Sequence, residues 1–171
     1  MLQRMLQAPR LRQRRPAPIA WLPLAAALGL GMPACAGPEP VMRALGGPLE
    51  LSAPARALPL DPPLQPRQRV QYVELGVPDA PRWRSGGAPG MAIDPTGRVY
   101  RIEVVLERAD GQRVVLDDLS FGRGLMFSHL PARRAPGGSD LPHGDRFVRL
   151  WLAATPPLSV GAIRWLDITN P

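Results

Sequence analysis

The residues best suited to bind a ligand lie in two glycine- and proline-rich stretches, 78–97 and 131–145. The candidate side chains are Arg82, Trp83, Arg84, Arg133, Arg134 and His143. Tryptophan offers a flat apolar face to a sugar ring, and arginine offers a planar fork of donors to an anion. Because long loops of compact domains often carry function, both stretches predict contact with a protein or glycan. The alternative for Trp83 is a cap on one end of the core, with solvated arginines beside it.

Catalytic chemistry has less support in the sequence. The chain has 21 arginines and no lysine, which excludes a Schiff-base lysine and the lysine of a phosphate-binding P-loop. Ser120, Ser128 and Ser139 all lack the Gly-x-Ser-x-Gly setting of a nucleophile elbow. We therefore expect no catalytic residue and a non-enzymatic protein.

Metal and cofactor sites are not indicated either. The two histidines, His129 and His143, form neither a His-x-His pair nor a His-Glu-x-x-His motif. The single cysteine, Cys35, excludes a disulfide within the chain and a cysteine-ligated zinc or iron–sulfur site. We expect no metal, no cofactor and a domain that is held together by its core alone.

The charge balance argues against a nucleic-acid partner. The formal net charge is +7, but five of the 21 arginines lie within the first 36 residues. Without that segment, sixteen arginines stand against fourteen acidic residues, a surplus of two. Nucleic-acid binding needs a concentrated basic surface, which so small a surplus does not indicate.

Residues 1–36 have the order of a bacterial export signal. Five arginines precede an apolar run at 21–30 that is too short to span a bilayer as a permanent helix. Residues 32–35, Met-Pro-Ala-Cys, resemble a bacterial lipoprotein signal, in which Cys35 becomes the lipidated first residue. Residues 34–36, Ala-Cys-Ala, equally fit cleavage by ordinary signal peptidase. Either route predicts export, to the periplasm or to a membrane through a lipid anchor.

Residues 37–69 form a proline-rich segment. Its eight prolines exclude a long helix, because proline removes a backbone donor and forces its predecessor towards extended geometry. One interpretation is a stalk that lifts the domain off a membrane, with a reach of roughly 100 Å when fully extended. The other is an edge segment of the domain, with Leu49-Glu50-Leu51 as a short strand.

The pattern of residues 70–171 predicts an all-β domain. The expected fold is a small antiparallel β-sandwich, with a small barrel as the alternative. The expected strands are 70–75, 98–108, 113–117, 146–152 and 160–168. Short strands with glycine and proline turns between them are typical of such folds. Trp151 and Trp165 fall in the apolar closing strands, where we expect them to be core residues.

The strongest strand, 98–108, shows which face turns inward. Tyr100, Ile102, Val104 and Leu106 alternate with a second set of mostly polar residues. This period of two predicts one core face and one mostly solvated face. The following Asp-Gly turn predicts a hairpin between this strand and 113–117.

The closing sequences RFVRLWLA (146–153) and PPLSVGAIRWLDI (156–168) resemble the last strands of galactose-binding-like β-sandwiches, the discoidin and carbohydrate-binding-module kind. The resemblance implies ligand loops at one end of a sandwich and carries over no particular residue. Together with the leader, it favours an exported, non-enzymatic binding or accessory module of the bacterial envelope. The alternatives are a hydrolase with an unrecognised site and a purely structural envelope component.

Overall fold

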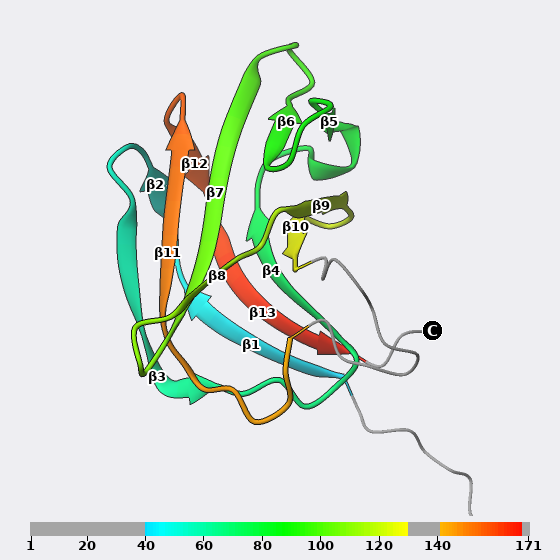
Figure 1. The fold of residues 1–171 in the computed structure, drawn as a ribbon. Coiled ribbons are helices and arrows are strands. Elements are labelled where there is room, and N and C mark those ends of the chain that lie inside the picture. The colour runs from blue at the N-terminus through cyan, green and yellow to red at the C-terminus, as the bar shows by residue number, and fades with distance from the viewer. Residues whose placement is uncertain (1–39, 130–140, 169–171) are drawn as a thin grey trace, which may run out of the picture. The chain divides into compact units, whose positions relative to one another are not determined.

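The computed structural model describes residues 40–129 and 141–168, which form an antiparallel β-sandwich (Figure 1). One sheet has the order β1-β13-β4-β10-β9, with β1 (Val41–Gly46), β13 (Ala162–Ile168), β4 (Val70–Gly76), β10 (Leu125–Ser128) and β9 (Asp118–Phe121). The other has the order β3-β11-β7-β6-β5, with β3 (Arg56–Leu64), β11 (Phe147–Thr155), β7 (Val99–Arg108), β6 (Met91–Ile93) and β5 (Arg84–Ser85). Additional pairs join β8 (Arg113–Val115) to β7, and β12 (Leu158–Val160) to β2 (Leu49–Leu51). Within the described residues, no helix is long and apolar enough to cross a membrane.

The core follows the alternation of the strands. On β7 the predicted inward residues are all buried: Tyr100, Ile102, Val104 and Leu106. Strands β4 and β13 of the other sheet contribute Val73, Leu75, Ile163 and Trp165. Trp165 is thus confirmed as a core residue, with 2% of its surface exposed. The predicted hairpin is also present, because β8 returns antiparallel along β7.

The proline-rich segment corrects the expected start of the domain at residue 70. Residues 41–64 hold three strands, and one of them is the expected short strand Leu49–Leu51. For these residues the edge-segment interpretation is confirmed and the stalk interpretation is wrong. β1 and β3 are the outer strands of the two main sheets, and β2 pairs with β12. An outer strand tolerates proline, because one side of its backbone has no neighbour that needs an N–H donor. Three leucines of this segment enter the core: Leu51, Leu60 and Leu64.

Strand directions place segment 78–97 and the described part of the second predicted loop, residues 141–145, at opposite ends of the sandwich. β4 begins beside the end of β13, where Gln71 pairs with Asp167, and finishes at Gly76. Segment 78–97 leaves from that second end, the upper end in Figure 1. Leu141 instead hydrogen-bonds Gln71 at the lower end. At about 3.3 Å per residue along β4, the two ends are roughly 20 Å apart.

Candidate functional site

Trp83 lies at the upper end as a cap on the core. A 3-10 turn at Ala80–Arg82 leads the chain into it, and its side chain is only 8% exposed. Its indole N–H donates to the Pro78 carbonyl oxygen at 3.0 Å, and its ring centroid lies 5.3 Å from that of Tyr100. Of the two interpretations of Trp83, the cap on the core is therefore confirmed and the exposed stacking platform is wrong, because burial against Tyr100 leaves little of the ring open to a ligand.

Arg82 and Arg84, on either side of Trp83, are both exposed. Neither forms an ion pair with any residue in 40–129 or 141–168. Together with residues 94–97 they line a hollow of about 420 Å³ at the upper end. The fixed Trp83 holds the backbone between them, so two guanidinium groups without ion-pair contacts share one rim with the Asp94 turn.

The other side of this hollow is a tight turn organised by Asp94. Its Oδ1 accepts hydrogen bonds from the Thr96 N–H at 2.8 Å, the Thr96 hydroxyl at 2.7 Å and the Arg98 N–H at 2.9 Å. The Thr96 hydroxyl, helped by these backbone donors, lowers the pKa of the Asp94 carboxyl below its ordinary value. Asp94 therefore stays ionised and keeps the turn in shape at neutral pH.

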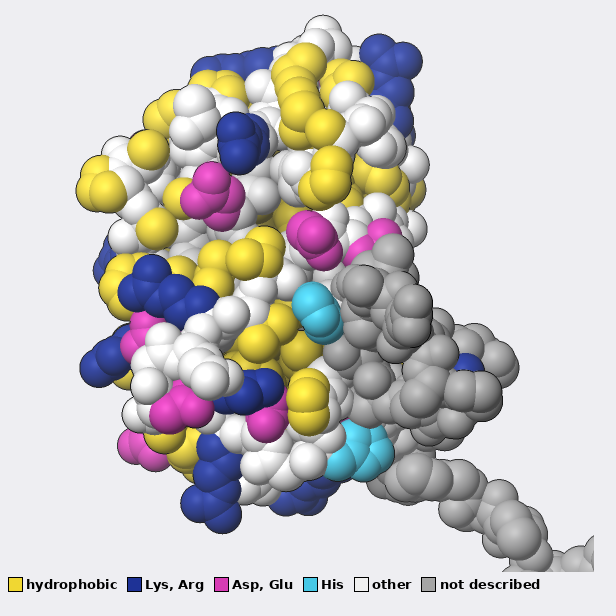
Figure 2. Space-filling model, viewed as in Figure 1, with side chains coloured by type: hydrophobic (Ala, Val, Ile, Leu, Met, Phe, Trp, Pro, Cys, Tyr) yellow, Lys and Arg dark blue, Asp and Glu magenta, His cyan; other side chains and the backbone are white. Residues whose placement is uncertain are grey.

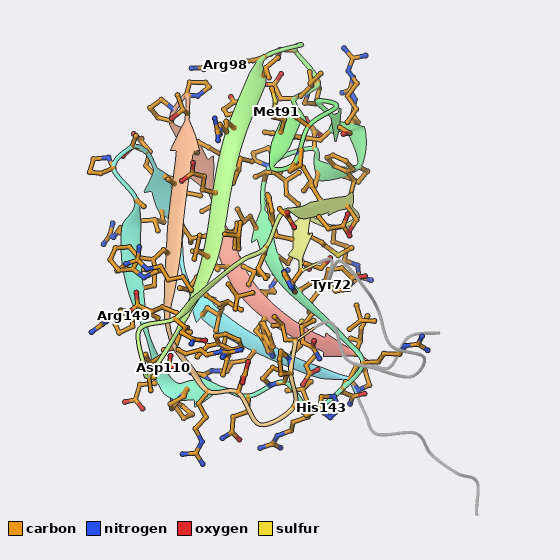
Figure 3. The ribbon with its side chains drawn as sticks, viewed as in Figure 1. Tyr72, Met91, Arg98, Asp110, His143 and Arg149 are labelled. Carbon is orange, nitrogen blue, oxygen red and sulfur yellow. The ribbon has the colours of Figure 1, made fainter. Side chains whose placement is uncertain are left out.

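A second hollow, of about 390 Å³, adjoins the first through Asp94 and Thr96. Its wall includes Arg98, whose guanidinium lies 5.4 Å from the centre of the Tyr100 ring. Arginine held over an aromatic face in this way is attracted to the ring electrons. Figure 3 shows Arg98 at the upper end of the molecule, so it joins Arg82 and Arg84 there.

Of the other predicted ligand-binding residues, the structure describes only His143, which does not join this group. His143 lies at the lower end (Figure 3), where its Nε2 is 3.1 Å from the carbonyl oxygen of Gln68. Arg133, Arg134 and Cys35 lie outside the described residues. Of the four predicted ligand-binding residues that the structure describes, Arg82, Trp83 and Arg84 share the upper end and His143 lies apart from them.

Sequence reasoning missed a buried polar group at the lower end. Asp167 is 1% exposed and accepts from the backbone N–H groups of Arg67 at 2.8 Å and Gln68 at 3.0 Å. It also accepts from Gln71 Nε2 at 3.0 Å, and Gln71 Oε1 accepts from the Leu141 N–H at 3.2 Å. These five residues form what we call the Asp167 cluster. It ties the chain before β4 and the chain before β11 to the end of β13.

The groups that could act in catalysis are engaged separately. Ser128 Oγ donates to Asp118 Oδ2 at 3.1 Å, while His129 Nδ1 is 3.1 Å from the carbonyl oxygen of Val115. Asp145 forms an ion pair with Arg108. Among the described residues, no three His, Cys, Asp or Glu side chains are grouped closely enough to hold a metal ion.

Comparisons with protein-family models, with curated proteins and with solved structures found no match. The resemblance of the closing strands to galactose-binding-like sandwiches therefore remains a prediction. Charge on the face in Figure 2 is mixed, with basic and acidic side chains interspersed.

Trp151 corrects the expectation that both closing-strand tryptophans are core residues. It is only partly buried, and its indole N–H donates to Glu107 Oε2 at 2.7 Å. Glu107 also accepts from Arg149 Nη1 at 2.6 Å and from Arg113 Nε at 3.1 Å. The Arg113 guanidinium lies 4.5 Å from the centre of the Trp151 ring. Trp151 thus belongs to a polar cluster on the outward face of β7 and β11.

This cluster predicts a pH-dependent contribution to stability. The hydrogen bond from Arg149, assisted by those from Trp151 and Arg113, lowers the pKa of the Glu107 carboxyl. A lowered folded-state pKa stabilises the fold above the unfolded pKa of about 4.3, and this gain is lost as pH falls through the folded pKa. Glu107→Gln should lower the melting temperature at neutral pH, with the difference from wild type shrinking in acid.

The matched control is Glu103→Gln, on the same outward face of β7. Glu103 is exposed and lies 3.8 Å from Arg101, a pair that solvent screens. Thermal melts followed by circular dichroism across the pH range should show little change for this variant. If the melting temperature of Glu107→Gln stayed equally far below that of the wild type in acid, the role of the ionised carboxylate would be contradicted.

Proposed function

We propose that this protein is an exported, non-enzymatic binding module of the bacterial envelope that holds an anionic glycan or protein at its upper end. The observation that carries the proposal is the pair Arg82 and Arg84, exposed and without ion-pair partners in the described part of the chain. Five arginines on the strands, by contrast, each have an acidic partner: Arg101, Arg108, Arg113, Arg149 and Arg164.

The local structure supports binding because it limits the ordering that a ligand must impose. Trp83 is fixed by its hydrogen bond to Pro78 and by contact with Tyr100. The Asp94 turn fixes the opposite side of the hollow. Binding is stronger when the protein groups are already held near their bound positions, since less conformational entropy is lost. The carboxylates and hydroxyls of an acidic glycan or peptide suit the arginine donors.

The location in the envelope is part of the proposal and is supported by the sequence. Residues 1–36 have the charge and apolar order of an export leader, and Cys35 occupies the position of a lipidated cysteine. We propose release into the periplasm or attachment to a membrane through that cysteine. Labelled fatty acid that enters the wild-type protein but not Cys35→Ala would support the anchor.

A pelleting assay with purified peptidoglycan tests the binding proposal, because this polymer carries both glycan and carboxylates. The full chain should sediment with peptidoglycan, and Arg82→Ala/Arg84→Ala should bind at least about tenfold more weakly. A hydrogen bond to a charged group contributes about 1.5–3 kcal/mol, so the loss of one suffices for that change. Raised salt should weaken binding of the wild type more than that of the variant.

The control is Arg101→Ala, which removes an exposed arginine that already faces Glu103. Its sedimentation should equal that of the wild type, and all three proteins should melt at similar temperatures. The proposal is wrong if the double variant sediments as well as the wild type, or if none of the proteins sediments.

A further inference from the structure

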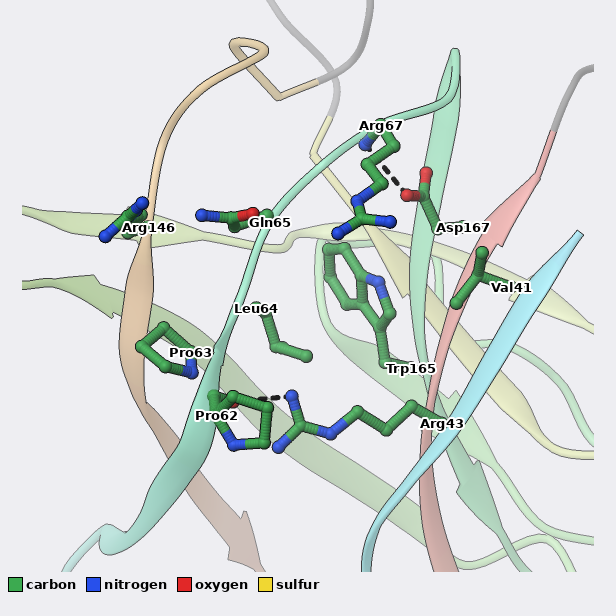
Figure 4. Close-up of a pocket in the computed structure, with 10 residues that line it drawn as sticks. All are labelled: Val41, Arg43, Pro62, Pro63, Leu64, Gln65, Arg67, Arg146, Trp165 and Asp167. Atoms are coloured by element: carbon green, nitrogen blue, oxygen red, sulfur yellow. Dashed lines mark hydrogen bonds between the residues drawn. The ribbon is translucent and has the colours of Figure 1, made fainter. Parts of the chain in front are cut away.

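A separate hollow of about 360 Å³ opens at the lower end, between the outer strands β1 and β3 (Figure 4). Arg43, Arg67, Arg146 and Gln65 line it, and Trp165 forms part of its wall. We call this hollow the arginine pocket. Its volume falls in the range of about 300–1,000 Å³ that is typical of small-molecule sites.

The wall of the pocket contains a hydrogen-bond donor that the described residues leave unused. Trp165 is 2% exposed, yet its indole N–H has no acceptor within 40–129 or 141–168. The other two described tryptophans both donate, Trp83 to Pro78 and Trp151 to Glu107. The Nε1 of Trp165 is not among the buried polar atoms that lack a partner, so the indole N–H is accessible to solvent at the hollow and is able to donate to a ligand there.

The charges around the pocket favour an anionic ligand. Arg67 and Arg146 are exposed, and neither their side chains nor that of Arg43 form an ion pair with a described residue. Arg43 instead donates from Nη1 to the Pro62 carbonyl oxygen, which turns its guanidinium towards β3. The one carboxylate in the lining, Asp167, already accepts hydrogen bonds on both oxygens. The pocket thus offers positive donors and an acceptor that is already in use.

We propose that the arginine pocket binds a small ligand with an oxyanion, a carboxylate or a phosphate, on a body of about the size of one sugar. The forked guanidinium groups of Arg67 and Arg146 hold the oxyanion, since arginine binds carboxylate and phosphate through paired hydrogen bonds. The Trp165 N–H holds a ring oxygen or hydroxyl. This site is distinct from the Arg82–Arg84 rim at the other end. The proposal for the arginine pocket therefore does not depend on whether a ligand binds at that rim.

Calorimetric titration of the full chain with three sugars of one body size tests this proposal. The probes are glucuronate, which carries a carboxylate, glucose 6-phosphate, which carries a phosphate, and uncharged glucose. We expect at least one of the two anions to bind, and glucose to bind at least tenfold more weakly. Binding of glucuronate alone assigns the oxyanion as a carboxylate, and binding of glucose 6-phosphate alone assigns it as a phosphate.

Variants connect the binding to the pocket. Arg67→Ala/Arg146→Ala should weaken binding at least tenfold without lowering the melting temperature, because both side chains are exposed and the Arg67 backbone N–H still reaches Asp167. Arg123→Ala, an exposed arginine in the turn between β9 and β10, is the matched control and should bind as the wild type does. The proposal is overturned if neither anion binds, if glucose binds equally well, or if the double variant binds as tightly as the control.

Discussion

A chain that begins at Arg69 will not fold cooperatively, whereas one that begins at Gly37 will. The shorter chain lacks β1, β2 and β3, and with them the buried side chains of Leu51, Leu60 and Leu64. Truncation of a buried leucine to alanine costs about 2–5 kcal/mol. Three such losses are comparable with the whole stability of a domain, about 5–15 kcal/mol.

Circular dichroism and thermal melting of the two purified chains measure this difference. The longer chain should show a β-rich spectrum and a sharp transition that a reductant does not change. The shorter chain should show a broad or absent transition, because β11 and β13 each lose a hydrogen-bonded neighbour. A sharp transition in the shorter chain would mean that the first three strands are dispensable.

Asp167→Ala should produce the second large effect, a loss of about 3–5 kcal/mol. The substitution leaves the backbone N–H groups of Arg67 and Gln68, and one donor of Gln71, without the carboxylate that they share. Each buried donor left unsatisfied costs about 1–3 kcal/mol. Because the cluster joins three separate parts of the chain, no single neighbour can replace the lost acceptor.

Urea denaturation provides the measurement, with Asp117→Ala as the control. Asp117 is exposed just after β8, and a surface change of this kind alters stability by about 0.5 kcal/mol or less. If the urea midpoint of Asp167→Ala equalled that of the control, water would be replacing the carboxylate as the acceptor for these donors at little cost in stability.

The sequence predicts the fold class because strands in the second half of the chain show a clear alternation of apolar and polar residues. Tyr100, Ile102, Val104 and Leu106 alternate over a full strand, and the period identifies both the strand and its inner face. β3 gives no such signal: its prolines suggest an extended linker, and only its place at the edge of a sheet makes them compatible with a strand. Its membership in the core depends on pairing with β11, far along the sequence.

The site was only partly predictable for the same reason. Arg82, Trp83 and Arg84 are adjacent in sequence, so their shared location follows directly, although burial of Trp83 does not. The arginine pocket gathers Arg43, Arg67 and Arg146 from three distant segments, and no spacing rule connects them. The structural role of Asp167 could not be predicted from the sequence, because two of its hydrogen-bond donors are backbone N–H groups about 100 positions away.

The early start of β1 has a consequence for geometry at a membrane surface. If Cys35 carries lipid, as we propose, only residues 36–40 separate the anchor from Val41. Five residues reach at most about 18 Å, so the domain would remain against the bilayer instead of standing far above it. Val41 also lines the arginine pocket, so that pocket would be oriented towards the headgroups. Arg82 and Arg84, at the other end of the strands, would then face the periplasmic space, and one small domain would present a different cationic site in each direction.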